Sequence, residues 1–154
     1  MATKTLNFYA YGLQKDTTVM LMFEPPNNHK LFKDQFPVVW KVITFRAKGH
    51  AKASIQYGAR LAFGYAQTDQ DNLVDSAAWV EVRVRAGSNV TAQFTPNLTA
   101  YVTRDYKATE MLRGEVETDA IWTRNLNELD DVTGWNFVED DASGAFSIVP
   151  STFV

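Results

Sequence analysis

The sequence predicts an all-β fold: a single-domain antiparallel β-sandwich of about ten strands that occupies residues 1–154. Apolar and polar residues alternate in several segments, as expected for strands with one buried face. Turn-forming residues recur about every eight to twelve positions, and no segment has the length and periodicity of a stable helix. A closed β-barrel is the alternative. The sandwich is favoured because the sequence lacks the helical lid and the early Gly-x-Trp that are usual in lipid-binding barrels of this size.

The clearest strand pattern runs from Ala53 to Tyr65, where every odd position is apolar or aromatic. Thirteen residues at about 3.3 Å each would extend about 43 Å, which is much longer than an ordinary strand. We therefore expect a bend, with Gly58 the first candidate and Gly64 the second.

The N-terminal third predicts three strands. Thr5–Ala10 and Thr17–Phe23 both alternate and together indicate a hairpin. Met20 and Met22 alternate with the apolar residues of the second strand, so we expect both of its faces to be covered. The most apolar run, Phe36–Phe45, predicts a central strand.

The remaining strands are expected after residue 78, with one ambiguous helical turn at 106–113. They are Trp79–Arg85, Val90–Phe94, Leu98–Val102, Ala120–Leu126, Trp135–Val138 and Ala145–Val149. The predicted core comprises Val38, Trp40, Val42, Ile55, Leu61, Phe63, Val80, Val82 and Val84.

The composition predicts a cytoplasmic protein. The chain has no cysteine, so it has neither a disulfide framework nor a thiolate metal site. The N-terminus has no apolar segment of the kind found in signal peptides. No apolar run approaches the roughly 18 residues of a membrane span.

Charge is distributed unevenly along the chain. Residues 1–60 carry nine Lys or Arg and three Asp or Glu, a balance of +6, whereas residues 107–154 carry three and ten, a balance of −7. The net charge of −3 argues against nucleic acid as a partner. Head-to-tail pairing of the two segments would give a self-associating structural protein, a homo-oligomer. Mutual neutralisation of neighbouring surface segments is the simpler interpretation.

No motif indicates an enzyme, a metal site or a cofactor. His29 and His50 lack the second ligand or paired base that a metal site or catalysis requires. The loop Asp69–Asp75 departs from the EF-hand pattern, because Val74 stands at the sixth position where glycine is needed. A looser calcium site in this loop is the alternative. We therefore expect a non-enzymatic protein without cofactor.

The aromatic residues give the strongest indication of binding, because Trp and Tyr combine an apolar ring with a polar group. Trp79 shares the charged side of its predicted strand with Arg83 and Arg85, which suggests an exposed ring next to hydrogen-bond donors. Packing of Trp79 under the loop 69–76 is the alternative. The candidate ligand-binding residues are Trp79, Arg83, Arg85, Trp40, Tyr57, Tyr65 and Trp122.

Three segments carry a family resemblance: Thr5–Phe8, Phe36–Val42 and Gln67–Asn72. In these the chain resembles small cysteine-free β-sandwich proteins of mushroom-forming fungi. The resemblance implies a cytosolic fruiting-body lectin, a defence protein or a binder of small compounds, pigments included. It transfers no site residues to this chain.

The leading functional hypothesis is a binding protein that holds a small aromatic or apolar ligand, such as a pigment, in a pocket between the sheets. A cytosolic lectin that binds glycans through Trp, Tyr and loop Asp or Asn is the second. The self-associating structural protein is the third.

Overall fold

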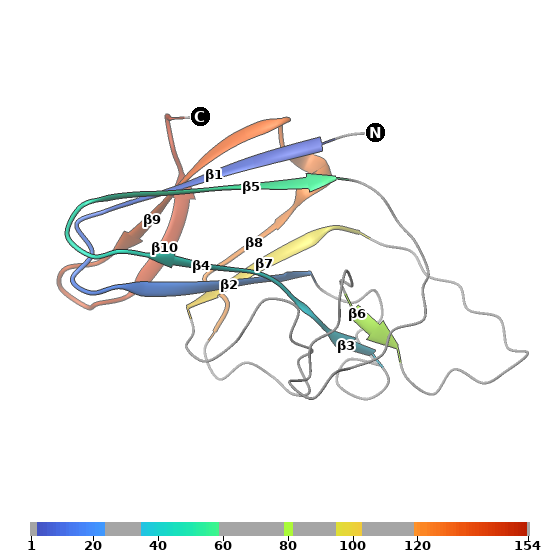
Figure 1. Cartoon of the computed structure of the whole chain (residues 1–154), viewed down its shortest axis with the longest axis horizontal. Coiled ribbons are helices and arrows are strands. Elements are labelled where there is room, and N and C mark those ends of the chain that lie inside the picture. Colours follow the sequence, from blue (N-terminus) through green and yellow to red (C-terminus); the bar gives the residue numbers. More distant parts are fainter. Residues whose placement is uncertain (1–2, 24–34, 59–78, 82–94, 103–118, 154) are drawn as a thin grey trace, which may run out of the picture.

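The computed structural model describes residues 3–23, 35–58, 79–81, 95–102 and 119–153 (Figure 1). Ten strands and one short 3₁₀ helix lie in these ranges. Eight of the strands form two four-stranded sheets that pack face to face, and neither sheet closes into a barrel. The prediction of an all-β sandwich is therefore confirmed.

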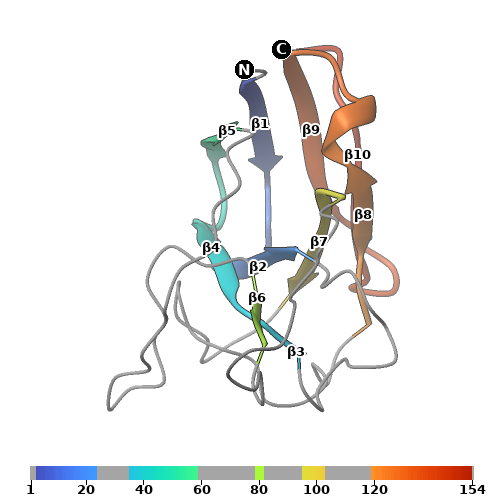
Figure 2. The same ribbon diagram turned by 90° about the vertical axis from the view of Figure 1, so that its right-hand side faces the viewer.

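The first sheet, called the β1 sheet, has the strand order β10-β9-β1-β5. Its strands are β1 (Thr3–Tyr11), β5 (His50–Gly58), β9 (Val132–Glu139) and β10 (Phe146–Pro150). β1 pairs with β5 in the antiparallel sense and with β9 in the parallel sense. The parallel pair lies at the centre of the sheet, so residues from the two ends of the chain form its middle (Figure 2).

The second sheet, called the β2 sheet, has the order β4-β2-β7-β8 and is antiparallel throughout. Its strands are β2 (Thr17–Phe23), β4 (Val39–Phe45), β7 (Asn97–Val102) and β8 (Trp122–Asn125), and the 3₁₀ helix η2 (Leu126–Glu128) follows β8 directly.

A separate two-stranded ladder joins β3 (Gln35–Pro37) to β6 (Trp79–Glu81). Both views show these two short strands next to each other beyond the end of β4 (Figures 1 and 2). The described part of the Trp79–Arg85 segment is therefore a strand, and Arg83 and Arg85 lie outside the described residues.

The core between the sheets is built from the inward faces that the alternation predicts. In β1, Leu6, Phe8 and Ala10 are buried. In β5, residues at odd positions are shielded and those at even positions are exposed, which confirms the pattern up to Gly58. Residues 59–65, which include Leu61 and Phe63, lie outside the described part.

Strand β2 is buried on both of its faces. Val19, Leu21 and Phe23 face the β1 sheet, whereas Met20 and Met22 join Val39 in a second buried cluster on the opposite side. This confirms the expectation that β2 is covered on both faces, and it explains why the strand is apolar at almost every position.

The predicted N-terminal hairpin is wrong. β1 and β2 are consecutive, but they belong to different sheets. The connection crosses the end of the sandwich, where Leu13 is buried and Gly12 adopts a φ of 69°. Two strands with apolar faces can bury these faces against each other across a sandwich as well as beside each other in one sheet.

The prediction of a central strand over Phe36–Phe45 is also wrong. The run divides into β3 and β4, and β4 is at the edge of its sheet among the described residues. Exposed Lys41 on this edge fits the preference of edge strands for charge. Val38 and Ile55 are buried as predicted, whereas Trp40 and Val42 are only half-buried.

The C-terminal strands agree with the sequence. β9 and β10 form a hairpin in which Gly144 takes a φ of 74°, and Pro150 is the last residue of the ladder. The segments 82–94 and 103–118, with their predicted strand and helical turn, lie outside the described part. Within the described ranges, no helix has the length and apolar character needed to cross a membrane.

Candidate functional site

Three aromatic rings meet where an edge of one sheet approaches an edge of the other. Phe23 and Trp40 come from β2 and β4, and Tyr57 comes from β5 of the opposite sheet. The Phe23 centroid lies 4.9 Å from that of Trp40 and 5.5 Å from that of Tyr57. Phe23, Trp40 and Tyr57 are called the three-ring cluster below. It is the part of the predicted ligand site that the structure brings together.

Trp40 reaches this position through a β-bulge. Leu21 pairs with Lys41 and Met22 pairs with Val39, so Trp40 is the extra residue of β4. Val39 packs with Met20 and Met22 in the second buried cluster, on the side of the β2 sheet away from the β1 sheet. Trp40 instead packs against the core between the sheets. Bulges redirect side chains and are frequent next to functional sites. The bulge therefore aims the indole of an edge strand at the opposite sheet.

The three-ring cluster is only partly shielded from solvent. Phe23 is buried, but Trp40 and Tyr57 are half-buried. Burial raises the pKa of the Tyr57 hydroxyl above its usual value, because the phenolate loses hydration. The hydroxyl is therefore protonated at neutral pH and can donate a hydrogen bond. The Lys41 ammonium lies 5.7 Å from the Trp40 ring centroid and adds positive charge beside the cluster.

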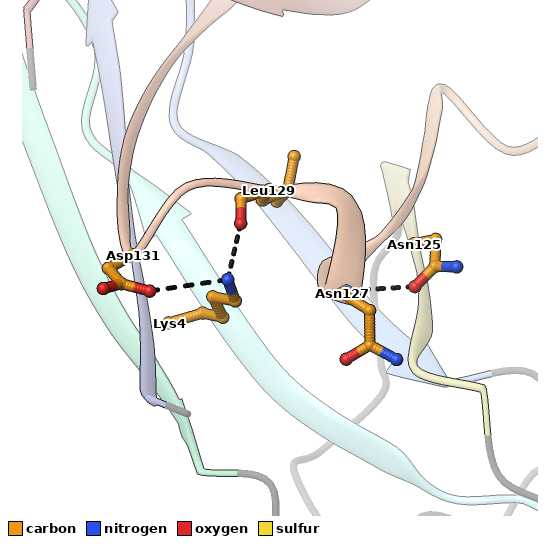
Figure 3. A network of polar contacts seen from close by, with 5 residues as sticks. All are labelled: Lys4, Asn125, Asn127, Leu129 and Asp131. Atoms are coloured by element: carbon orange, nitrogen blue, oxygen red, sulfur yellow. Dashed lines mark hydrogen bonds and ion pairs between the residues drawn. The ribbon is translucent and has the colours of Figure 1, made fainter. Parts of the chain in front are cut away.

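Lys4 ties the two ends of the chain together at the same end of the sandwich. It is opposite Tyr57 in the β1–β5 register. Its ammonium donates a hydrogen bond to the Leu129 carbonyl and lies 3.5 Å from the Asp131 carboxylate (Figure 3). Because these contacts occupy Lys4, we assign it a structural role beside the cluster rather than a binding role.

The 3₁₀ helix η2, which precedes Leu129, is capped by its own sequence. The Asn125 side chain accepts a hydrogen bond from the Asn127 N–H at 3.0 Å (Figure 3). Leu126 is fully buried beneath this turn. The cap and the Leu126 anchor fix the chain between β8 and β9, which lie in different sheets.

Trp122, another predicted ligand residue, lies elsewhere in the core. It is 4% exposed, and its ring makes edge contacts with Phe8 at 5.8 Å and Trp135 at 5.1 Å. Within the described residues no ring contact joins it to Trp40 or Tyr57, and its buried N–H has no hydrogen-bond partner there. The Arg124 guanidinium lies 5.9 Å from the Trp122 ring centroid. Trp122 therefore joins the sheets at a second position, away from the three-ring cluster.

The other predicted site residues are not described at the level of side chains. Trp79 pairs through its backbone with Pro37, and the position of its ring lies outside the described part. Tyr65, Arg83 and Arg85 also lie outside the described residues, as do His29 and the Asp69–Asp75 loop. The hypothesis that Trp79 stands next to arginine donors stays a prediction.

Two features of the site were missed by sequence reasoning. Phe23 was not among the candidate ligand-binding residues, although it is the ring that contacts both Trp40 and Tyr57. The bulge could have been predicted from the sequence, because the apolar pair Val38–Val39 followed by Trp40 interrupts the period of two.

His50 and the acidic residues do not form a metal site in the described ranges. His50 is exposed on the outer face of the β1 sheet, where its ring lies 4.4 Å from that of Tyr11. No group of three or more His, Asp or Glu suited to a metal ion occurs among the residues that the structure describes.

Comparison with known proteins adds no relatives: no protein-family model, no curated protein and no solved structure matches this chain. The resemblance to fungal β-sandwich proteins stays a prediction.

Proposed function

We propose that the protein is a non-enzymatic binding protein that holds a small, flat aromatic or apolar ligand against the three-ring cluster. The observation that carries this proposal is the β-bulge at Trp40, which directs an indole from an edge strand towards Tyr57 of the opposite sheet. A half-buried indole offers a ligand both a large apolar surface and a ring face for stacking.

The polar groups around the cluster narrow the class of ligand. Tyr57 keeps its proton and can donate to a carbonyl or carboxylate oxygen. The Lys41 ammonium beside Trp40 favours a ligand with negative charge or a polarised carbonyl. A conjugated ring system that bears such an oxygen satisfies both groups, and pigments belong to this chemical class.

Fluorescence titration with anilinonaphthalene sulfonate, a flat aromatic anion, tests this proposal. We expect saturable binding, with Trp40→Ala weakening the affinity roughly tenfold, which corresponds to about 1.4 kcal/mol. That value lies near the upper end of what an aromatic contact contributes. Tyr57→Phe serves as a milder variant that keeps the ring. Lys41→Glu should weaken binding of this anion, and Tyr11→Ala on the outer face is the matched control that should not.

Native mass spectrometry of the purified protein provides a second readout. An additional mass that disappears in Trp40→Ala supports a retained ligand at the cluster. If Trp40→Ala lowers the thermal unfolding temperature while Trp40→Ala and Tyr57→Phe both keep the full dye affinity, the cluster is core packing alone and the proposal is wrong.

A further inference from the structure

The large apolar side chains that are exposed gather on one face of the described structure. Tyr11 and Phe153 are each 70% exposed, and three valines are between 41% and 46% exposed. In β1, Leu6, Phe8 and Ala10 point into the core, so Tyr9 and Tyr11 point away from it. The exposed valines alternate with inward residues of β9 and β10 in the same way. They are Val132, Val138 and Val149.

The outer face is the name used below for this surface. It comprises Tyr9, Tyr11, Val132, Val138, Val149 and Phe153. Several of its rings are held in place by neighbours. Tyr11 lies against His50 with centroids 4.4 Å apart, and Phe153 makes an edge contact with Tyr9 at 6.3 Å. The Lys52 ammonium is 5.6 Å from the centre of the Tyr9 ring. Exposed apolar patches with a polar border mark interaction surfaces, and rings that are already ordered lose little entropy on binding.

Opposite charges flank this face at one end of the sandwich. The β4–β5 turn exposes Arg46 and Lys48, and the β9–β10 turn exposes Asp140 and Asp141. Both turns lie at the end that carries the β1–β2 connection (Figure 1). The β1–β2 connection is hydrogen-bonded to both turns. The Gly12 N–H donates to the Gly49 carbonyl in the β4–β5 turn, and the Gln14 N–H donates to the Glu139 carboxylate at the β9–β10 turn.

From these observations we infer that the outer face binds a second copy of this chain in a two-fold symmetric, face-to-face dimer. The strand order β10-β9-β1-β5 has its basic turn on the β5 side and its acidic turn on the β10 side. A two-fold axis parallel to the strands brings β5 of one copy over β10 of its partner. The basic turn of each copy then faces the acidic turn of the other, and both complementary contacts form twice.

The same axis also matches the apolar residues. β1 of one copy crosses over β9 of its partner, so Tyr11 lies over Val138 and Tyr9 over Asn136. Sheets that pack face to face in this way interdigitate their side chains at a separation of about 10 Å. A partner with only one kind of charge would satisfy one turn and repel the other, so the charge pattern favours a second copy over an unrelated protein.

The area of the outer face indicates how stable a dimer we expect. The four strands have nine, nine, eight and five residues, and at about 3.3 Å per residue and about 4.8 Å between strands they cover roughly 490 Å² in projection. This is less than the roughly 800 Å² per partner of a standard stable interface. We therefore expect a reversible dimer whose population rises with protein concentration.

Sedimentation or light scattering over a concentration series tests the dimer. We expect the mass to rise from 17.4 kDa towards twice that value. Tyr11→Ala should raise the dimer dissociation constant roughly tenfold or more, as removal of a large interface ring can do. Because the ring is exposed, this variant should keep the fold, and thermal unfolding verifies this.

A charge-swap cycle tests the orientation. Lys48→Glu and Asp141→Lys should each weaken the dimer, and the double variant should restore it. Lys41→Glu, an equal charge reversal at an exposed position of the β2 sheet, is the matched control and should leave the dimer unchanged. Asp141 is preferred to Asp140, because the Asp140 carboxylate holds its own turn by accepting from the Ala142 N–H.

A monomer at every concentration overturns the inference, as does a dimer that tolerates both Tyr11→Ala and the single charge reversals. Glycan-array binding by a monomer that depends on Tyr11 also overturns it, because the face then belongs to a sugar. Dye binding at the three-ring cluster is measured separately with Trp40→Ala, so failure of the dimer and failure of the proposed function are distinguishable.

Discussion

The rings of Trp40 and Tyr57 meet edge to face across the boundary between the two sheets, with centroids 6.4 Å apart and planes at 84°. Their strands, β4 and β5, are consecutive in the chain and are joined at the opposite end of the sandwich, near Gly49. The ring contact therefore links the sheets at the end of β5 farthest from this connection. Both rings remain partly accessible to solvent.

From the raised pKa of the Tyr57 hydroxyl we predict a loss of stability at alkaline pH. Burial raises its pKa in the folded protein above the usual 10.0, so the unfolded chain releases this proton first. Its contribution to the unfolding free energy is complete below pH 10.0 and is lost as the pH rises towards and through the folded pKa. Urea unfolding should therefore show a steeper alkaline loss for the wild type than for Tyr57→Phe.

Tyr11→Phe is the matched control for that measurement, because it removes a hydroxyl from a ring that is 70% exposed. This variant should retain the alkaline slope of the wild type. An unchanged slope in Tyr57→Phe would contradict the assignment of a raised pKa to Tyr57.

Leu98 tests the packing between the sheets. It is fully buried and pairs with Phe23 in the β2–β7 register. Leu98→Ala should lower the unfolding free energy by about 2–5 kcal/mol, because the core cannot fully close the cavity. Leu98→Met nearly conserves the volume and should cost less than about 1.5 kcal/mol. Equal effects of the two substitutions in urea unfolding would show that the site is not tightly packed.

Alternation in the sequence was enough to predict the inward faces of individual strands. Leu6, Phe8 and Ala10 in β1 and Ile55 in β5 are buried as their periodicity requires. Met20 and Val19 were also expected on opposite faces of their strand, and they pack into two different buried clusters. These inferences succeeded because a period of two depends only on local backbone geometry.

Neighbour relations between strands could not be predicted in the same way. The parallel pairing of β1 with β9 joins Phe8 to Trp135, which are distant in sequence, and no local pattern specifies it. The hairpin prediction failed for this reason, since an apolar face does not reveal whether its partner lies beside it or across the core.

The candidate site was predicted in part. Trp40 and Tyr57 were both chosen for their aromatic character, and the structure brings them together. Trp122 was chosen on the same ground but packs against Phe8 and Trp135 instead. Composition identifies residues that can bind, whereas their grouping depends on the bulge at Trp40 and on strand order, which are properties of the assembled sheets.

Asp140 predicts a stability change at acidic pH. Hydrogen bonds from the Ala142 N–H, the Ser143 N–H and the Ser143 hydroxyl lower the pKa of this carboxyl below 3.8. Its contribution is present above pH 3.8 and is lost as the pH falls through the folded pKa. Asp140→Asn should therefore unfold more easily than the wild type at neutral pH, and the difference should shrink in acid. Asp141→Asn is the control and should show no such convergence.

Substitutions at Lys4 and Asp131 distinguish the stability contributed by a hydrogen bond from that contributed by an ion pair. Its side chain is 12% exposed and donates to the Leu129 carbonyl, whereas its ionic partner Asp131 is 85% exposed. Lys4→Met keeps the aliphatic stem but leaves the carbonyl without this donor, so urea unfolding should show a loss of about 1–3 kcal/mol. Asp131→Asn removes only an exposed charge and should cost less than about 1 kcal/mol. If Asp131→Asn proved the more damaging substitution, the ion pair rather than the hydrogen bond would be what holds β1 against the chain that enters β9.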